Sequence, residues 1–268
     1  MSGFSFVHIT DHHLLESEEA IRDGFCPGHA LRRVMRHIAG TVADKADFIL
    51  STGDLVEPEL DANYQCAVKL LGVNAPAALP GPQHVNVEGL QNFPMYFMPG
   101  NHDDRALMTK YLFPSTPQAP ALYNFTFEHK GVQFVCMDWG PRSKAYLLPE
   151  TQAFLAQALK ADLPTVLVMH QHVKRIGSRW LDNFLADNLG EFWNTVLPHK
   201  DKLLAILSGH VHITYEDEYR GIPLLGLRST AYMFAKTDEP LVILADVQYR
   251  YVHVHEGVLT SRVYTVNI

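Results

Sequence analysis

Cysteine is scarce in this chain, which has only Cys26, Cys66 and Cys136 among its 268 residues. Three cysteines that lie far apart do not make a disulfide framework, so we expect a reducing, cytoplasmic setting. Residues 1–10 lack a basic leader and a long apolar run, and no later apolar stretch is long enough to cross a bilayer. The sequence therefore predicts neither a signal peptide nor a membrane partner.

The chain also lacks any concentration of positive charge. Its 22 Lys and Arg residues are scattered among 29 Asp and Glu residues, and the formal net charge is −7. Proteins that bind nucleic acid usually present a basic patch to the phosphate backbone, so this class of partner is excluded as a first hypothesis. With 47% hydrophobic residues, the chain has enough apolar side chains for a full core, and we expect one domain over residues 1–268.

Apolar runs and helical patterns alternate along the first half of the chain. The runs Phe4–Thr10, Asp47–Ser51 and Met95–Met98 resemble buried strands, and residues 29–43 place apolar side chains on one helical face. This alternation predicts right-handed crossovers and a largely parallel sheet.

The second half contains a predicted hairpin, a helix that begins at Pro149, and further strands. The expected strands cover residues 121–127, 132–137, 165–169 and 203–207, with antiparallel strands after Ile213 that turn at Arg220-Gly221 and His255-Glu256-Gly257. Two packed sheets with helices outside them form the natural assembly.

Gly72–Phe93 differs from the rest because it is rich in proline and has Glu88 as its single formally charged residue. We expect a long surface loop here, inserted into the domain at about residues 72–93. Loops of this length are often functional or form contacts, and this one is a candidate contact for a homo-oligomer.

Histidine is frequent, with 15 residues, and many of them fall in short motifs that follow the predicted strands. Side chains at the carboxyl ends of neighbouring strands converge on one crevice, where open α/β sheets place their active sites. The five motifs are Asp11-His12-His13, Gly53-Asp54, Gly100-Asn101-His102-Asp103, His170-Gln171-His172 and Gly209-His210-Val211-His212.

These motifs supply oxygen and nitrogen ligands for two metal ions. One ion would be held by Asp11, His13, Asp54 and His212, and the other by Asp54, Asn101, His170 and His210. The absence of thiolate favours Mn, Fe, Co or Zn. Two such ions leave the site positive and hold an activated hydroxide between them, which suits attack on a phosphate ester.

Each motif also has an ordinary structural interpretation. Gly-Asp is common in turns, Asn-His can be loop chemistry, and a lone histidine beside an apolar strand is more often structural than a ligand. The ordered set of five is far more specific than any single member. Histidines outside the set, such as His8, His37 and His253, are interpreted as structural.

The ordered motifs resemble those of the calcineurin-like metallophosphoesterase superfamily, over residues 6 to about 265. The stretches around Gly177–Asp182 and Arg228–Thr230 are similar to class III 3′,5′-cyclic nucleotide phosphodiesterases and their glycerophosphodiesterase relatives. This resemblance implies an α/β fold, a four-layer αββα sandwich of two mixed β-sheets flanked by helices. It also implies a binuclear phosphodiesterase in which His170 is the ligand of its motif, although Gln171-His172 replaces the usual His-Pro.

The expected reaction is hydrolysis of a small phosphodiester, most simply a cyclic nucleotide such as cyclic AMP. His102 follows a predicted ligand without being one itself, so it is the candidate acid that protonates the leaving alkoxide, and Asp103 would orient it. Trp180 is a candidate for stacking on a nucleobase. The alternatives are a glycerophosphodiesterase, a broad phosphodiesterase or phosphomonoesterase, and a scaffold that binds metal without turnover.

Overall fold

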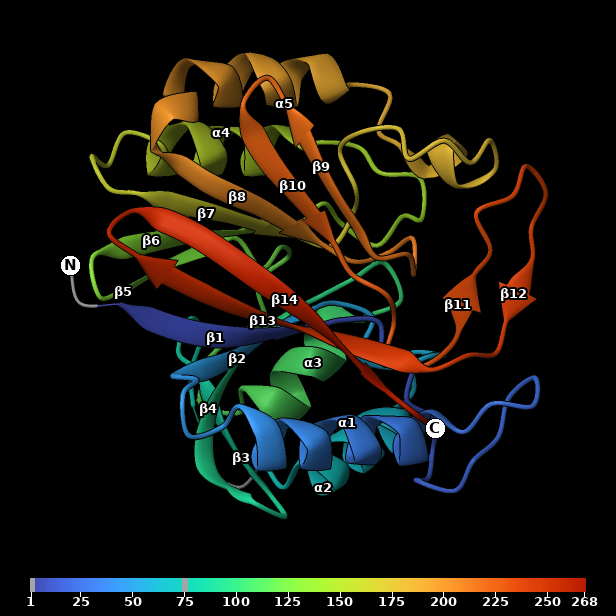
Figure 1. Cartoon of the computed structure of the whole chain (residues 1–268). Coiled ribbons are helices and arrows are strands. Elements are labelled where there is room, and N and C mark those ends of the chain that lie inside the picture. Colours follow the sequence, from blue (N-terminus) through green and yellow to red (C-terminus); the bar gives the residue numbers. More distant parts are fainter. Residues whose placement is uncertain (1–2, 74–76) are drawn as a thin grey trace.

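Two six-stranded sheets face each other at the centre of the molecule (Figure 1). The computed structural model describes residues 3–73 and 77–268. In spatial order the first sheet contains β14 (Val258–Val266), β13 (Val247–His255), β1 (Phe4–Ile9), β2 (Phe48–Thr52), β4 (Leu90–Met98) and β3 (Gln83–Val87). The second contains β5 (Phe125–His129), β6 (Val132–Met137), β7 (Thr165–Met169), β8 (Leu203–Ser208), β10 (Ile222–Gly226) and β9 (Tyr215–Tyr219).

Both sheets have a parallel centre and antiparallel edges. The neighbours β1, β2 and β4 run parallel, as do β6, β7, β8 and β10. The hairpins β13–β14 and β9–β10 turn at the predicted Gly-containing positions. The parallel centre matters for function because it brings the carboxyl ends of several strands to one edge.

Helices cover the outer face of each sheet, as Figure 1 shows. Helices α1 (Pro27–Thr41), α2 (Asp61–Leu71) and α3 (Arg105–Leu112) pack on the first sheet, and α4 (Pro149–Ala158) and α5 (Leu189–Val196) pack on the second. Shorter elements are the 3₁₀ turns η1 (Leu181–Phe184) and η2 (Leu197–Lys202) and the strands β11 (Met233–Phe234) and β12 (Val242–Ile243).

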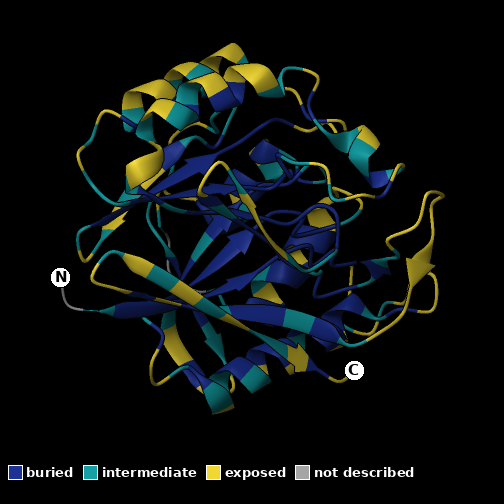
Figure 2. Cartoon of the chain, turned by 45° about the horizontal axis from the view of Figure 1, so that its top comes forward, coloured by how far each residue is buried: buried dark blue, intermediate teal, exposed yellow. Residues whose placement is uncertain are grey.

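The side chains of β1 explain why the layers stack in this order. Phe4 and Phe6 point into the core between the sheets, while Val7 and Ile9 point into the core beneath α1. Successive strand residues face opposite sides, so a strand covered on both faces is mostly apolar. The buried polar residues of β1, Ser5 and His8, form hydrogen bonds with His253 and Thr52. Figure 2 shows the buried central strands between more exposed helices. The predicted four-layer αββα sandwich is confirmed.

The expected long loop over Gly72–Phe93 is wrong for its second half, and residues 74–76 of that prediction lie outside the described residues. Strand β3 and the start of β4 lie inside it and form an antiparallel hairpin that turns at Glu88-Gly89. Val85 and Leu90 are fully buried in the core beneath the first sheet. Proline at the start of the segment hid a pattern of alternating apolar residues, and burial of these residues stabilises the hairpin at the sheet edge.

Candidate metal centre

The predicted ligands converge at one edge of the sandwich, beyond the carboxyl ends of five strands. Asp11 and His13 follow β1, and Asp54 and Asn101 follow β2 and β4 of the same sheet, whereas the other three histidines follow β7 and β8 of the second sheet. Six of the seven are buried and Asn101 is partly exposed. The set consists of Asp11, His13, Asp54, Asn101, His170, His210 and His212.

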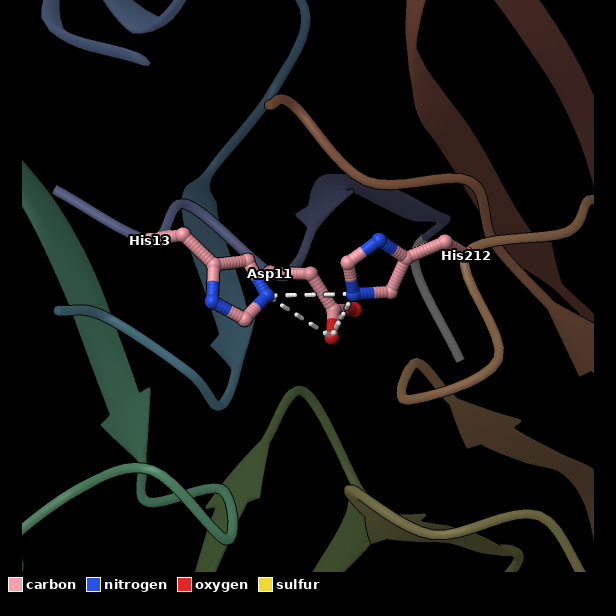
Figure 3. A group of neighbouring side chains, drawn as sticks. All are labelled: Asp11, His13 and His212. Carbon is pink, nitrogen blue, oxygen red and sulfur yellow. Dashed lines mark hydrogen bonds and ion pairs between the residues drawn. The ribbon is translucent and has the colours of Figure 1, made fainter. Parts of the chain in front are cut away.

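Three of these residues form a first group that could hold a metal ion, Asp11, His13 and His212 (Figure 3). The Nε2 atoms of the two imidazoles lie 3.0 Å apart, and Nε2 of His212 lies 3.1 Å from Oδ1 of Asp11. The residues come from opposite ends of the sequence, and only the packing of the two sheets brings them together.

The outer nitrogen of each of these imidazoles faces an oxygen atom, which favours a proton on that nitrogen. Nδ1 of His212 donates to the carbonyl oxygen of Tyr232 at 2.8 Å, and Nδ1 of His13 lies 2.8 Å from Oε2 of Glu57. With a proton on each Nδ1, both Nε2 lone pairs point at the same space beside the Asp11 carboxylate. Two converging lone pairs repel unless a cation separates them, so this donor set fits a metal ion.

The second group consists of Asp54, His170 and His210. Nδ1 of His170 donates to the carbonyl oxygen of Thr52 at 2.8 Å, while its Nε2 lies 3.2 Å from Oδ2 of Asp54 and 3.2 Å from Oδ1 of Asn101. Nε2 of His210 is buried and has no hydrogen-bond partner among residues 3–73 and 77–268. An unpaired buried nitrogen is costly, and a metal ion at this position would satisfy it.

Asp54 belongs to the second group and also lies close to the first. Its Oδ1 accepts a hydrogen bond from the His102 backbone N–H at 2.9 Å, which fixes the carboxylate. Its Oδ2 lies 3.2 Å from Nε2 of His170 and 3.7 Å from Nε2 of His13, one residue from each group. The carboxylate is therefore placed where it could contact ions in both groups.

The backbone of the site is strained where the predicted ligands attach. Five of the seven predicted ligands have a backbone in the left-handed region, with φ between 45° and 69°: Asp11, His13, Asp54, His210 and His212. Each costs about 1–3 kcal/mol for a residue with a side chain, and such strain concentrates at functional sites. Gly100 meets a related constraint, because a Cβ there would lie 2.0 Å from Oδ1 of Asp54.

The charges of the site favour ionised carboxylates. Burial raises the pKa of Asp11 and Asp54, but the neighbouring imidazoles outweigh it, and both pKa values fall below the usual range. For His170, burial lowers the pKa, yet Asp54 and Asp11 raise it to about 9. Burial and the neighbouring His170 keep the pKa of His210 well below its usual value.

His102 borders the first group but belongs to neither. Its ring lies edge-on to that of His13, with centroids 5.4 Å apart, and its side chain is 36% exposed. The expected role of Asp103 in orienting this ring is wrong. The Asp103 carboxylate instead accepts hydrogen bonds from the backbone N–H groups of Gly100 and Leu55, so it stabilises the loops that carry the predicted ligands.

Glu57 is a member of the site that the sequence analysis missed. Its carboxylate contacts Nδ1 of His13 at 2.8 Å and NH1 of Arg22 at 2.9 Å, accepts from the Tyr232 hydroxyl at 3.2 Å, and lies 4.0 Å from Nδ1 of His102. Burial raises the pKa of Glu57, but the contact with His13 and the nearby His102 and Arg22 lower it to about 2. Its position three residues after Asp54, in the same loop, was the available signal.

Two other residues singled out in the sequence lie near the centre without lining it. Trp180 packs edge-on against Phe234 and Phe184, with centroid distances of 4.9 Å and 6.0 Å. His172 is buried, its ring centroid lies 6.0 Å from that of His210, and it belongs to neither candidate group, so His170 is the histidine of its motif that joins one.

No helix within residues 3–73 and 77–268 has the length and apolarity needed to cross a membrane.

Comparison with known proteins agrees with this geometry. The chain is 28% identical over 236 residues to the 3′,5′-cyclic adenosine monophosphate phosphodiesterase CpdA of Haemophilus influenzae, covering 85% of this chain and 77% of that protein. It is 24% identical over 233 residues to the glycerophosphodiester phosphodiesterase GpdQ of Enterobacter lignolyticus, covering 84% and 77%.

A dimetal phosphatase from Danio rerio has the same fold, with a TM-score of 0.70 at 12% sequence identity and 98% coverage of both chains. The sequence model of the calcineurin-like phosphoesterase family matches residues 4–214, which is most of the chain and includes all seven predicted ligands. These matches, together with two buried groups of metal-binding side chains, indicate a dinuclear centre. The chain belongs to the calcineurin-like phosphoesterase family and is a metal-dependent phosphoesterase.

Proposed function

We propose that this protein is a binuclear phosphodiesterase that hydrolyses a 3′,5′-cyclic nucleotide such as cyclic AMP. The observation that carries the proposal is the similarity to a cyclic AMP phosphodiesterase over 236 residues, which extends beyond the family match at residue 214. Beyond residue 214 the chain forms β13, β14 and the β11–β12 hairpin, and residues of this hairpin line a pocket that borders the candidate metal centre.

The ligand assignment follows the two groups. Asp11, His13 and His212 would hold one ion and Asn101, His170 and His210 the other, with Asp54 shared between them. Donors of this chemistry accept Mn, Fe, Co or Zn. When bound, two such ions lower the pKa of a coordinated water and polarise the phosphoryl oxygens.

His102 is the proposed general acid. The alkoxide that leaves a cyclic nucleotide is strongly basic and needs a proton as the P–O bond breaks. The His102 ring is open to solvent while the predicted ligands beside it are buried, so a substrate oxygen can reach it. This protonation would contribute about 10²–10⁴ in rate.

A glycerophosphodiester is the second candidate substrate. Its support is the similarity to the glycerophosphodiester phosphodiesterase GpdQ, which covers nearly the same share of this chain. Both diesters would place the phosphate on the same centre, so the seven predicted ligands do not distinguish them. The difference must come from residues around the centre.

Turnover by purified, Mn-loaded protein tests the proposal directly. We expect the highest kcat/KM with cyclic AMP, a lower value with a glycerophosphodiester, and the lowest with p-nitrophenyl phosphate. The Asp54→Ala variant serves as the control for contaminating activity. Efficient turnover of the glycerophosphodiester with none of cyclic AMP would replace the first candidate by the second.

A further inference from the structure

A pocket opens beside the first metal-binding group and takes no part in the chemistry described above. It borders this group directly, because His13 forms part of its lining. The other lining residues are Arg22, Asp23, Phe25, Pro27, Glu57, Tyr232, Phe234, Val242 and Leu244.

Two turns form opposing walls of this pocket. On one side, Arg22 and Phe25 exchange two backbone hydrogen bonds of 2.9 Å, and Asp23 and Gly24 between them have φ of 51° and 81°. Positive φ at both central residues is the geometry of a type I′ turn. On the other side lies the hairpin of β11 and β12, which projects from the body of the protein in Figure 1. The walls meet at Leu244, whose Cδ1 lies 3.6 Å from the place that a Cβ on Gly24 would occupy.

The hairpin wall is apolar and exposed. Val242 and Leu244 line the pocket and are 50% and 54% exposed, within a run of four large apolar residues from Leu241 to Leu244 that all face solvent at least in part. Contiguous apolar side chains on a protein surface commonly mark a binding site. Glu57, paired with Arg22, supplies a polar edge where the pocket meets the metal centre.

The aromatic floor of the pocket is continuous with the metal centre. The ring of Phe234 stacks on His212 with centroids 4.4 Å apart and planes 20° apart, and Tyr232 lies 5.0 Å from the ring of His13. Trp180 packs edge-on against Phe234 and is not among the residues that line the pocket. A ligand whose phosphate lies at the metal centre would therefore extend its organic substituent over Phe234 and toward Val242.

We propose that this pocket is the subsite for the organic substituent of the substrate, and that it takes a planar, weakly polar ring such as a nucleobase. The inference rests on the proposed function and deepens it. A ring can cover the apolar side chains of Val242 and Leu244, whereas a polyol would lose hydrogen bonds to water against them without replacement. Val242 and Leu244 are then specificity-determining residues.

Binding measurements on the Mn-loaded protein isolate the ring from the phosphate. Adenosine 5′-monophosphate and ribose 5-phosphate share the phosphate and the sugar and differ in the base. Isothermal titration should give tighter binding of the nucleotide by wild type. Val242→Asn and Leu244→Asn should each raise its Kd about tenfold, which corresponds to about 1.4 kcal/mol, and leave the Kd of ribose 5-phosphate unchanged.

Leu241→Asn is the matched control, because Leu241 is 49% exposed on the same hairpin but does not line the pocket. It should leave both Kd values unchanged. All three positions are at the surface, and equal thermal unfolding midpoints would show that the fold is intact. The asparagine substitutions are uncharged, so they do not change the electrostatic attraction of either phosphate.

Equal weakening of both ligands by the pocket variants would overturn the subsite, as would wild type that binds ribose 5-phosphate as tightly as the nucleotide. Nucleotide binding that is unchanged in both variants would overturn it as well. These outcomes are separable from failure of the proposed function. Absence of cyclic AMP turnover with a retained preference for the nucleotide would refute the reaction and support the subsite. Turnover of cyclic AMP with nucleotide binding unchanged in the Val242 and Leu244 variants would support the reaction and refute the subsite.

Discussion

Replacing Glu57 by leucine should weaken the binding of one of the two metal ions and leave the affinity for the other unchanged. The variant removes the carboxylate oxygen 2.8 Å from Nδ1 of His13, which favours a proton on Nδ1 and so leaves the lone pair of Nε2 facing Asp11 and His212. The second group does not depend on Glu57, because His170 donates to the backbone carbonyl of Thr52. The leucine also leaves Arg22 without this partner, but Arg22 is 48% exposed and remains hydrated.

The expected magnitude follows from the geometry of this contact. Loss of a charged partner behind a metal ligand typically lowers metal affinity by about 10–100-fold, or about 1.4–2.7 kcal/mol. Titration of the metal-free protein with Mn²⁺, analysed for two sites, should show one Kd raised by this factor and the other unchanged. Tyr232→Phe is the control, since it removes only the hydroxyl 3.2 Å from Glu57 and keeps the carbonyl that accepts from His212.

Two results would refute this reasoning. If the Glu57→Leu variant binds both ions with wild-type affinity, the carboxylate does not orient His13. If the affinity for both ions falls by the same factor, Glu57 supports the whole site rather than one group. A large effect of Tyr232→Phe on either Kd would place the important contact at the hydroxyl instead of the carboxylate.

Three further predictions concern other parts of the structure. Asp54→Ala should lose at least one ion per chain, and elemental analysis that finds two bound metals would contradict its shared role. His102→Ala should keep both metals but lose about 10²–10⁴ in rate on cyclic AMP and much less on bis(p-nitrophenyl) phosphate, whose leaving group needs no proton; equal losses would exclude it as the acid. Burial and Arg250 lower the pKa of His8 from 6.5 to about 3. Between pH 6.5 and about pH 3, His8 therefore binds a proton in the unfolded chain but not in the folded chain. The free energy of unfolding should therefore fall as pH drops below 6.5, and His8 alone should account for about 2 kcal/mol of this loss at pH 5. In urea unfolding, the His8→Gln variant should lose correspondingly less stability over this pH range.

Strands and their ends could be predicted from the sequence because they depend on local pattern. Phe4–Thr10 is apolar on both faces, so it has to lie between two covering layers, and the polar residues after it mark where the buried strand ends. The same reasoning held for β7 and β8, which the sequence analysis placed within one residue of their observed bounds.

The hairpin at β3 and β4 shows the limit of local pattern. Val85 and Leu90 become buried only because the hairpin packs into the core that the first sheet forms with its helices. The same holds for Asp103, whose position next to His102 in sequence suggested a contact. The backbone N–H groups of Leu55 and Gly100 attract its carboxylate more effectively, since they need an acceptor in the buried loops.

The sequence by itself determined which side chains are available for metal chemistry and that each follows a buried strand. The tertiary structure decided how they are grouped, because His13 and His212 are separated by 199 positions and meet only where the two sheets pack together. It also decided that Glu57 lies behind His13 and that Val242 and Leu244 form a wall beside the centre. Periodicity along a chain reports which face of an element is buried, whereas contacts between distant loops depend on how whole layers pack.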